Sequence, residues 1–182
     1  MIEKDDNELV YEVIHGSISS FEILIERYQN TVFNMVLRMV NERETALDLT
    51  QDVFIKAFEK MGSFNFKYRF FSWIYRIAAN ETINYLKSQR RFESLSKVER
   101  AGIAEEADTG REARSKKLHL GLKLLRADQR LLILLKYYFG LSYEEMAETL
   151  GLPEKKIKAR LFTAREKLKD ELLKNDFFDE ER

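Results

Sequence analysis

Apolar and polar residues follow one another along the chain with the period of an α-helix. From Phe21 to Met39, apolar side chains recur at spacings of three and four residues, which predicts an amphipathic helix. Ser19 followed three positions later by Glu22 is typical of a capping box at the start of such a helix. The apolar stripe consists of Phe21, Leu24, Ile25, Tyr28, Val32, Met35, Val36 and Met39. No alternation of period two, which would indicate strands, stands out in the sequence.

Two more helices are predicted before this pattern lapses. Asn41 and Glu44 repeat the capping device ahead of the second helix. The apolar stripe expected for it is Leu47, Phe54, Phe58 and Met61. A third helix is predicted from about Phe70 to Lys87. We therefore expect residues 1–92 to form one helical domain.

Residues 93–114 are interpreted as a flexible linker. Gly102 and Gly110 bracket several carboxylates, and large apolar residues become sparse, although a short helix is compatible with the pattern. Apolar periodicity resumes at Leu118 and intensifies over residues 131–135. The expected fold class is all-α, with two small helical domains at 1–92 and 115–175 joined by the linker.

Residues 140–169 have the pattern of a helix-turn-helix. Ser142 with Glu145 forms a capping box, Gly151 suits the turn, and Pro153 suits the first position of the next helix. The buried side of the first helix is expected to be Met146, Ala147 and Leu150. Two helices joined by so short a turn commonly place the second one in the DNA major groove.

The last helix has two faces on a wheel drawn at 100° per residue. Its core stripe is Ile157, Leu161, Ala164 and Leu168, and its opposite face is Lys155, Ala159, Phe162, Thr163 and Glu166. Cations flank that outer face, namely Lys156, Arg160 and Lys167 on one side and Lys158, Arg165 and Lys169 on the other. We call this outer face the reading face, because it could contact base edges in the major groove. The cations on its two sides would then face the two phosphate backbones that border the groove. The alternative is a solvated helix with Phe162 in a domain contact.

A short segment of the first domain combines aromatic and basic residues. Its seven rings are Phe64, Phe66, Tyr68, Phe70, Phe71, Trp73 and Tyr75. Single-stranded nucleic acid is bound by such rings and cations, which stack bases and neutralise phosphates. Phe64 and Phe66 follow Gly62 in a predicted loop and are the best candidates to meet a base, whereas Trp73 has the spacing of a core residue. Candidate DNA-contacting residues here are Phe64, Phe66, Lys67, Arg76, Asn80, Asn84 and Lys87, whereas Ile77, like Trp73, has the spacing of a core residue.

Composition excludes several classes of protein. There is no cysteine and there are only two histidines, far apart, which argues against a thiolate or histidine metal site and against a histidine-based hydrolase. We expect no metal, no cofactor, no small-molecule substrate and no enzymatic activity. No apolar run approaches the length of a membrane span, and the acidic start is unlike a signal peptide, so we expect a cytoplasmic protein.

The formal net charge of zero hides a segregation of charge along the chain. The net charge is −6 over residues 1–60, +5 over 61–92, −3 over 93–110, +7 over 111–170 and −3 over 171–182. Two basic blocks separated by an acidic one indicate two contacts with a polyanion, although solvated helix surface is the simpler alternative.

With these segments assembled, the chain resembles the extracytoplasmic-function (ECF) sigma factors, small two-domain factors of bacterial transcription initiation in the sigma-70 superfamily. The resemblance covers about residues 21–91 and 118–172. It rests on residues 46–54 (ALDLTQDVF) and 71–80 (FSWIYRIAAN) in the first domain, and on residues 141–147 (LSYEEMA) and 160–165 (RLFTAR) in the second. Each motif is weak alone, and their order and spacing together are specific.

The resemblance implies roles for residues in both domains. The outer side of the second helix would dock on the clamp of the polymerase largest subunit, through Asp48, Gln51, Asp52, Ile55 and Glu59. Phe64, Ile77 and Asn80 match positions that capture a flipped base of the promoter minus-ten element. The last helix would read the minus-thirty-five element through Lys155, Lys156, Lys158, Ala159, Arg160, Phe162, Thr163 and Arg165. Without the resemblance, the acidic face would be interpreted as solvated carboxylates.

The resemblance also implies partners. They are core RNA polymerase, contacted at its clamp and at its β flap, promoter DNA, and an anti-sigma factor that often holds the sigma factor at the inner face of the membrane. The chain departs from the family pattern in two ways: Lys155–Lys156 replace a pair of small residues, and Thr163 stands where a basic residue often contacts guanine. Thr163 cannot make that bidentate contact, so the family predicts where bases are read and not which bases.

Two other functions are compatible with parts of the sequence. A stand-alone helix-turn-helix regulator would explain the second domain, but it leaves the aromatic segment and the acidic helix face without a role. A purely structural helical protein would leave both basic blocks without a role.

Overall fold

The structure, a computed structural model, describes residues 4–96, 118 and 120–174, and every regular element in that part of the chain is helical. The all-α prediction is therefore confirmed. Residues 120–124 are helical as well. The remaining elements are α1 (Asp6–Ile14), α2 (Ile18–Val40), α3 (Arg43–Lys60), the 3₁₀ turn η1 (Met61–Ser63), α4 (Phe70–Ser96), α6 (Ala127–Ile133), the π-helical segment η2 (Leu134–Tyr138), α7 (Tyr143–Leu150) and α8 (Glu154–Lys174).

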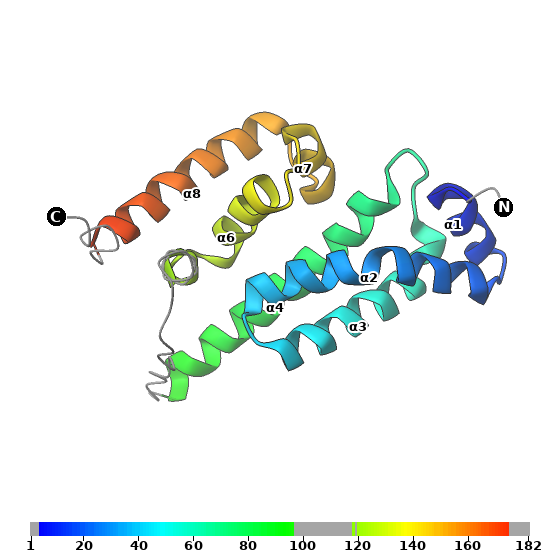
Figure 1. The fold of residues 1–182 in the computed structure, drawn as a ribbon, viewed down its shortest axis with the longest axis horizontal. Coiled ribbons are helices and arrows are strands. Elements are labelled where there is room, and N and C mark those ends of the chain that lie inside the picture. The colour runs from blue at the N-terminus through cyan, green and yellow to red at the C-terminus, as the bar shows by residue number, and fades with distance from the viewer. Residues whose placement is uncertain (1–3, 97–117, 119, 175–182) are drawn as a thin grey trace, which may run out of the picture.

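Helices α1 to α4 form the first domain (Figure 1). The sequence analysis did not predict α1, which begins with a capping box between Asp5 and Glu8. It packs on α2 and buries Leu9, Val10 and Val13. Because α1 has only two turns and is acidic at its start, its apolar period was too short to stand out from the surrounding polar residues.

The caps of α2 and α3 differ by one or two residues from those predicted. Ser17, not Ser19, caps α2 by accepting a hydrogen bond from the backbone N–H of Ser20 at 3.3 Å. Asn41 ends α2 in the left-handed conformation, with φ of 60°, instead of starting α3. The cap of α3 is Glu42, whose carboxylate accepts from two backbone N–H groups. Asparagine is favoured both at the C-terminal end of a helix, in the left-handed conformation, and as the N-cap of the next helix. The sequence alone therefore does not decide between these two positions for Asn41, and the predicted one was wrong.

The apolar stripe predicted for α3 is correct only in part. Phe54 and Met61 are buried, whereas Leu47 is 43% exposed and Phe58 is 49% exposed. Besides Phe54, the buried residues of α3 are Ala46, Leu49, Thr50, Val53 and Ala57, three of which are small. Small residues at these positions allow α3 to lie close to α2 and α4, and Leu47 and Phe58 lie at the edge of that contact.

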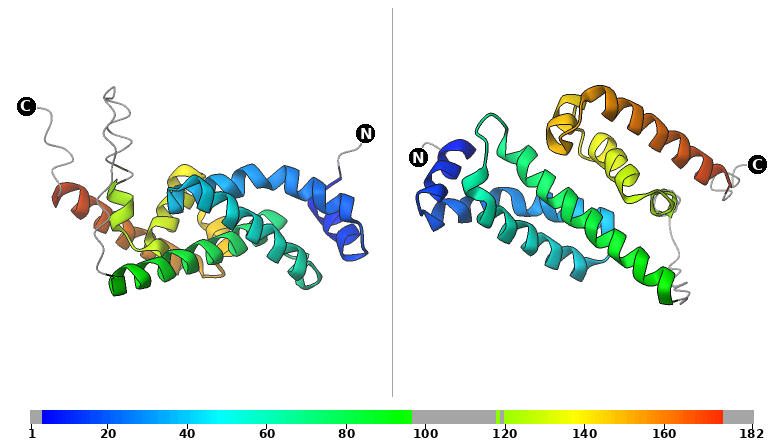
Figure 2. Two further views of the ribbon diagram at one scale, coloured as in Figure 1. Left: turned by 90° about the horizontal axis from the view of Figure 1, so that it is seen from below. Right: turned by 180° about the vertical axis from the view of Figure 1, so that it is seen from behind.

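Helix α4 is longer than predicted and continues to Ser96, four residues into the span expected to be linker. Most of the expected linker, from residue 97 to 114, lies outside the described residues. Helix α4 packs against α2 and α3 in the first domain and also against α6 and α7 in the second, and α2 contacts α6 as well (Figures 1 and 2).

The second domain contains the predicted helix-turn-helix. Ser142 and Glu145 form the capping box of α7, and Gly151 ends that helix with φ of 64°, as expected. Pro153 lies one residue before α8, rather than at its first position, and its carbonyl accepts from the backbone N–H of Lys156. Helices α6 and α7 lie between α8 and the first domain (Figure 1). The outer side of α8 is therefore free of the first domain.

Aromatic and basic side chains join the two domains. Tyr75 of α4 and Phe139, just after η2, meet edge to face with ring centroids 6.0 Å apart. The Arg38 guanidinium of α2 lies 3.4 Å from the ring centroid of Tyr138. Arg90 of α4 donates to the backbone carbonyl of Leu125 at 3.0 Å. The domains are thus held against each other by specific contacts along α2 and α4.

Candidate nucleic-acid and polymerase interfaces

The outer face of α3 presents the predicted polymerase-docking residues. Asp48, Gln51, Asp52, Ile55 and Glu59 are all exposed. Residues at these spacings share one side because an α-helix turns by 100° per residue. Leu47 and Phe58 lie on the flank of this face, where the Phe58 ring packs 5.0 Å from that of Phe21 in α2. The face therefore combines carboxylates with one large apolar side chain, Ile55, a composition suited to a basic protein surface.

The structure corrects the placement of Phe64. Its ring is only 6% exposed and packs against Trp73 and Phe66, at centroid distances of 5.5 Å and 5.2 Å. The expectation that Phe64 presents its ring to a base is thus wrong for this arrangement. Phe64 directly follows η1, which turns the chain inward, and its neighbours Phe70 and Trp73 supply an apolar site for the ring.

Phe66 occupies the exposed position that was expected for both rings. It is 47% exposed, and its neighbours Lys67 and Tyr68 are also exposed. The backbone N–H of Lys67 donates to the Asn65 side-chain carbonyl at 3.0 Å, which fixes a tight turn at this point. The surface of this loop, which is residues 64–69, therefore presents two aromatic rings, those of Phe66 and Tyr68, together with the cation Lys67.

Helix α4 continues this surface with a row of polar side chains. Asn80, Asn84 and Lys87 are exposed, and helical geometry places them on one side of α4. Ile77 is buried, so its side chain packs in the core and does not line the surface as the family resemblance had suggested. Arg76 is half-buried because its guanidinium contacts α7 of the second domain.

The reading face of α8 is arranged as the helical wheel predicts. Ile157, Leu161 and Ala164 are buried, and the eight predicted minus-thirty-five residues are all exposed. Phe162 is 63% exposed, which excludes the alternative in which it is tucked into a domain contact of this chain. The hydroxyl of Thr163 donates to the backbone carbonyl of Ala159 at 3.1 Å, so its proton is engaged within α8 while its methyl group and the oxygen lone pairs remain at the surface.

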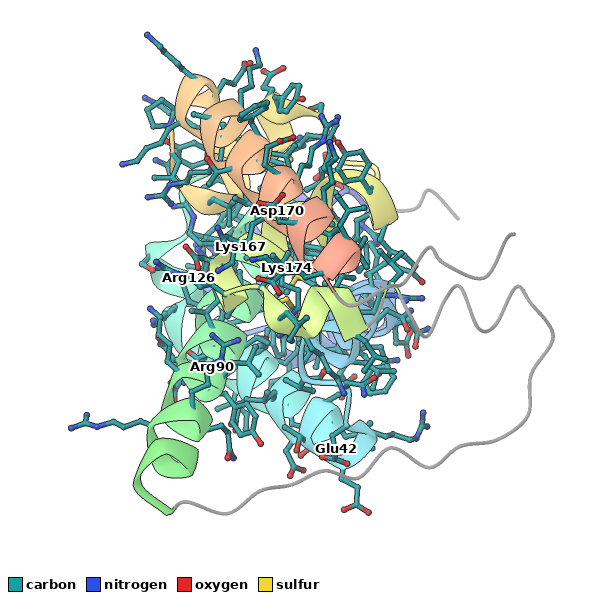
Figure 3. The ribbon with its side chains drawn as sticks, turned by 90° about the vertical axis from the view of Figure 1, so that its left-hand side faces the viewer. Glu42, Arg90, Arg126, Lys167, Asp170 and Lys174 are labelled. Carbon is teal, nitrogen blue, oxygen red and sulfur yellow. The ribbon has the colours of Figure 1, made fainter. Side chains whose placement is uncertain are left out.

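Cations of both domains are visible from one side of the molecule. Figure 3 shows Arg90 on α4, with Arg126 and Lys167 above it in the second domain.

On α8, Lys158 forms an ion pair of 3.1 Å with Glu154 and lies 5.1 Å from the ring of Tyr143. Exposed ion pairs of this kind are weak and exchange readily for a phosphate contact.

The sequence analysis did not include Arg69 among the candidate site residues, although the structure gives it contacts with the second domain. Its guanidinium forms ion pairs with Glu145 at 3.1 Å and with Glu148 at 3.5 Å, both on α7. The pKa of Glu145 is lowered by the backbone N–H of Ser142 and further by Arg69. Arg69 lies within the basic block of residues 61–92, which was the only sequence signal for it.

Comparison with known proteins agrees with this arrangement. Residues 24–92 match the family model of sigma-70 region 2, and residues 115–168 match that of sigma-70 region 4. The chain is 35% identical to the ECF RNA polymerase sigma-E factor of Escherichia coli strain K12, over 88% of this chain and 91% of the relative. It is 33% identical to the ECF sigma-E factor of Haemophilus influenzae, over 92% of this chain and 95% of the relative.

Two solved structures have a similar fold. One is the sigma factor RpoE of Bartonella quintana in complex with the anti-sigma factor NepR, which is 27% identical with a TM-score of 0.65 over 87% of this chain and 99% of that one. The other is CnrH in complex with the cytosolic domain of CnrY, which is 23% identical with a TM-score of 0.69 over 94% of this chain and 98% of that one. The second likeness bears on the fold alone.

One matched region covers α2 from residue 24, α3 and most of α4, and the other covers α6, α7 and most of α8, in the order that the sequence motifs predicted. In the described residues, no helix is both long enough and apolar enough to cross a membrane. Sigma factors are non-catalytic initiation factors. The chain belongs to the sigma-70 family as an ECF sigma factor, an alternative sigma factor that directs promoter-specific transcription initiation.

Proposed function

We propose that three separate surfaces of the chain bind three different partners during initiation. The outer face of α3 docks on the polymerase clamp, the 64–69 loop with the polar row of α4 captures the opened minus-ten strand, and α8 reads the minus-thirty-five element as duplex. The observation that carries this proposal is the exposure of Phe66 and of the α8 reading face in one chain. Duplex reading and single-strand stacking need different chemistry, and the two domains supply one each.

Strand capture accounts for melting without nucleotide hydrolysis. Extruding a base costs a few kcal/mol, and stacking it on an aromatic side chain returns about 1–3 kcal/mol per base. Phe66 offers such a ring, and Asn80 offers both a hydrogen-bond donor and an acceptor to a base edge. Ile77 and Phe64 would support this surface from below, by fixing the position of α4 and of the loop. The polymerase supplies the remaining contacts.

We infer that an anti-sigma factor is a further partner. One structural relative at 27% identity was solved in complex with the anti-sigma factor NepR, and it aligns with 87% of this chain. An inhibitor of that kind needs access to surfaces used in initiation, and both the α3 face and the α8 face are exposed here. If the complex is held at the membrane, the anti-sigma factor would provide the attachment.

Runoff transcription tests the proposal. The full chain is added to core polymerase on a library of templates with random promoter sequence, and enriched transcripts reveal two spaced sequence elements if the proposal holds. Duplex binding without polymerase association, and without transcripts that depend on the added chain, would instead favour a stand-alone helix-turn-helix regulator. Core polymerase alone is the control for background initiation.

A further inference from the structure

The first helix of the chain lies outside the family match and still contacts the region of the 64–69 loop. The match to sigma-70 region 2 begins at residue 24, whereas α1 spans Asp6–Ile14. Helix α1 packs on α2 and also on η1, the turn that leads into the 64–69 loop. Figure 1 shows α1 beside the connection between α3 and α4. A helix to which the family match gives no role therefore borders the start of the loop.

One carboxylate at the start of α1 is connected to the other end of the loop. Asp6 accepts hydrogen bonds from the Arg27 guanidinium and from the Tyr28 hydroxyl, both on α2. The Tyr28 ring lies against that of Phe70, the first residue of α4, with ring centroids 5.2 Å apart. Phe70 directly follows the loop. Asp6 and Tyr28 thus link α1 to the point where the 64–69 loop ends.

The Tyr28 hydroxyl is a constant donor in this link. Burial, together with the hydrogen bond to Asp6, raises the pKa of Tyr28 above the usual range of tyrosine. The hydroxyl therefore keeps its proton at physiological pH and donates to a carboxylate, which is a stronger bond than one between neutral groups. A hollow of about 570 Å³ lies between the start of α1 and the start of α4, and its lining includes Asp6, Tyr28 and Phe70. Tyr28 therefore bridges the two helix starts beside this hollow.

A row of aromatic rings continues from Phe70 to the exposed ring of the loop. The ring centroid of Phe64 lies 6.1 Å from that of Phe70 and 5.2 Å from that of Phe66. Trp73 packs against the two buried rings, at 5.6 Å from Phe70 and 5.5 Å from Phe64. Packed aromatic rings have preferred geometries, so a shift of one ring displaces its neighbours. The position of the Phe66 ring therefore depends on rings that Tyr28 holds in place.

The bonds of Asp6 are not the only contacts that hold α1 on the domain. Helix α1 packs on α2 and buries three apolar residues, namely Leu9, Val10 and Val13. Farther along α1, the Glu12 carboxylate accepts a hydrogen bond from the Ser20 hydroxyl of α2. The hydrogen bond between Asp6 and Tyr28 is therefore additional, and what it adds is the connection to Phe70.

We propose that Asp6 and Tyr28 are positioning residues for strand capture, which hold the 64–69 loop so that Phe66 faces the opened DNA strand. They act through Phe70 and Phe64 and not by contact with DNA. The inference rests on the proposed stacking of a base on Phe66. Without the hydrogen bond between Asp6 and Tyr28, the loop takes other positions as well. The apparent affinity for the opened strand then falls with the fraction of molecules whose loop is in place.

The single tryptophan of the chain reports the position of the loop. Trp73 packs against Phe64, so displacement of the loop should make its indole more accessible to iodide, which quenches fluorescence. Excitation at a wavelength that tyrosine does not absorb restricts the signal to Trp73. This measurement needs neither polymerase nor DNA, so it tests the link independently of the proposed function.

Two variants break the link and two leave it intact. Tyr28→Phe removes only the hydroxyl, and Asp6→Ala removes its acceptor, so both should increase the quenching of Trp73 by iodide. Tyr11→Phe and Glu22→Ala make similar changes at exposed positions of α1 and α2 and should leave the quenching unchanged. Far-ultraviolet circular dichroism confirms that each variant is folded.

Promoter opening is then measured with the full chain and core polymerase, by permanganate footprinting on a promoter that the runoff experiment selects. If the loop is in place in about one molecule in five without the hydrogen bond, Tyr28→Phe should reduce the open complex about fivefold. In a chain that already carries Phe66→Ala, Tyr28→Phe should cause no further loss, because the ring that it positions is absent. Affinity for core polymerase and for a duplex carrying only the minus-thirty-five element should not change.

Three outcomes would overturn the inference. Equal quenching of Trp73 in the two link variants and their two controls would show that the link does not hold the loop. Losses from Tyr28→Phe and Phe66→Ala that multiply in the double variant would show that Tyr28 acts on stability and not through Phe66. If Phe66→Ala opens the promoter normally, or if no form opens one, although the quenching rises as expected, the proposed strand capture fails together with its positioning, while the link between α1 and the loop stands.

Discussion

Arg130 in α6 donates a hydrogen bond of 2.6 Å to the backbone carbonyl of Met39 in α2, 91 positions earlier in the chain. The same guanidinium donates to the carbonyls of Leu122 and Lys123 at 2.9 Å and 3.0 Å. Burial, with a smaller contribution from Arg90, lowers the pKa of Arg130 to about 10. That pKa is well above neutrality, so a charged, buried side chain connects the two domains through carbonyl oxygens.

Replacement of Arg130 by lysine should destabilise the chain. An ammonium group is a compact donor that cannot span the three carbonyls as the planar guanidinium does. We expect Arg130→Lys to lower the free energy of unfolding by about 2–4 kcal/mol, measured by urea denaturation of the full chain. Arg126→Lys, at a residue 68% exposed, is the matched control and should change it by less than about 0.5 kcal/mol. Equal values for the two variants would contradict the connecting role of Arg130.

Most of the helices, though not α1, could be predicted from the sequence, and the contact between the domains could not. Apolar periodicity located α2, α3, α4 and the helix-turn-helix because each buries a stripe of regular period. The interdomain contact depends on Arg76, Arg90 and Arg130, whose partners are largely backbone carbonyls. Every residue carries a carbonyl, so no residue pattern identifies which one an arginine will bind.

Charge reversal at Asp52 should impair polymerase docking. Asp52 is exposed on the outer face of α3, so the fold does not depend on it. We expect Asp52→Lys to weaken binding to core polymerase by about tenfold or more, because a cation then faces a basic surface. Glu26→Lys changes an exposed carboxylate of α2 and should bind normally. Fluorescence anisotropy of the labelled chain with core polymerase gives both affinities, and normal binding by Asp52→Lys would remove that face from the proposal.

The two phenylalanines of the 64–69 loop should have different roles. Phe64 is buried, so Phe64→Ala should lower the free energy of unfolding by about 3–5 kcal/mol. Phe66 is half-exposed, so Phe66→Ala should leave most of the stability intact. It should nevertheless reduce open-complex formation by about tenfold, the loss expected for one base stack of 1–3 kcal/mol. Permanganate footprinting measures promoter opening, and unimpaired opening by Phe66→Ala would exclude it from strand capture.

The difference between Phe64 and Phe66 also marks the limit of the sequence analysis at the candidate site. On α8 the helical period separates buried from exposed residues, so all eight minus-thirty-five candidates were placed correctly as exposed. Phe64 and Phe66 lie outside the regular helices, where no period indicates which ring is buried. The η1 turn determines which ring is buried, because it directs Phe64 toward Trp73.

Asn80 should contribute to strand capture and not to duplex binding. Its side chain is exposed on α4, far in sequence from the reading helix α8. Asn80→Ala should therefore reduce the amount of open complex by about fivefold to tenfold, the effect of one or two lost hydrogen bonds. Its affinity for a duplex carrying only the minus-thirty-five element should not change. Asn34→Ala, an exposed asparagine on α2, is the control. An equal loss in both assays would assign Asn80 a structural role.

Arg160 and Arg165 test whether α8 lies in a groove between two phosphate backbones. The two side chains are exposed on opposite sides of the reading face, where each would neutralise a phosphate of a different strand. Each alanine substitution should weaken binding to all duplexes alike and reduce the slope of log affinity against log salt by about 1. Lys60→Ala removes an exposed cation at the end of α3 and should leave the slope unchanged. A change of slope for only one of the two arginines would place α8 against a single backbone and contradict groove reading.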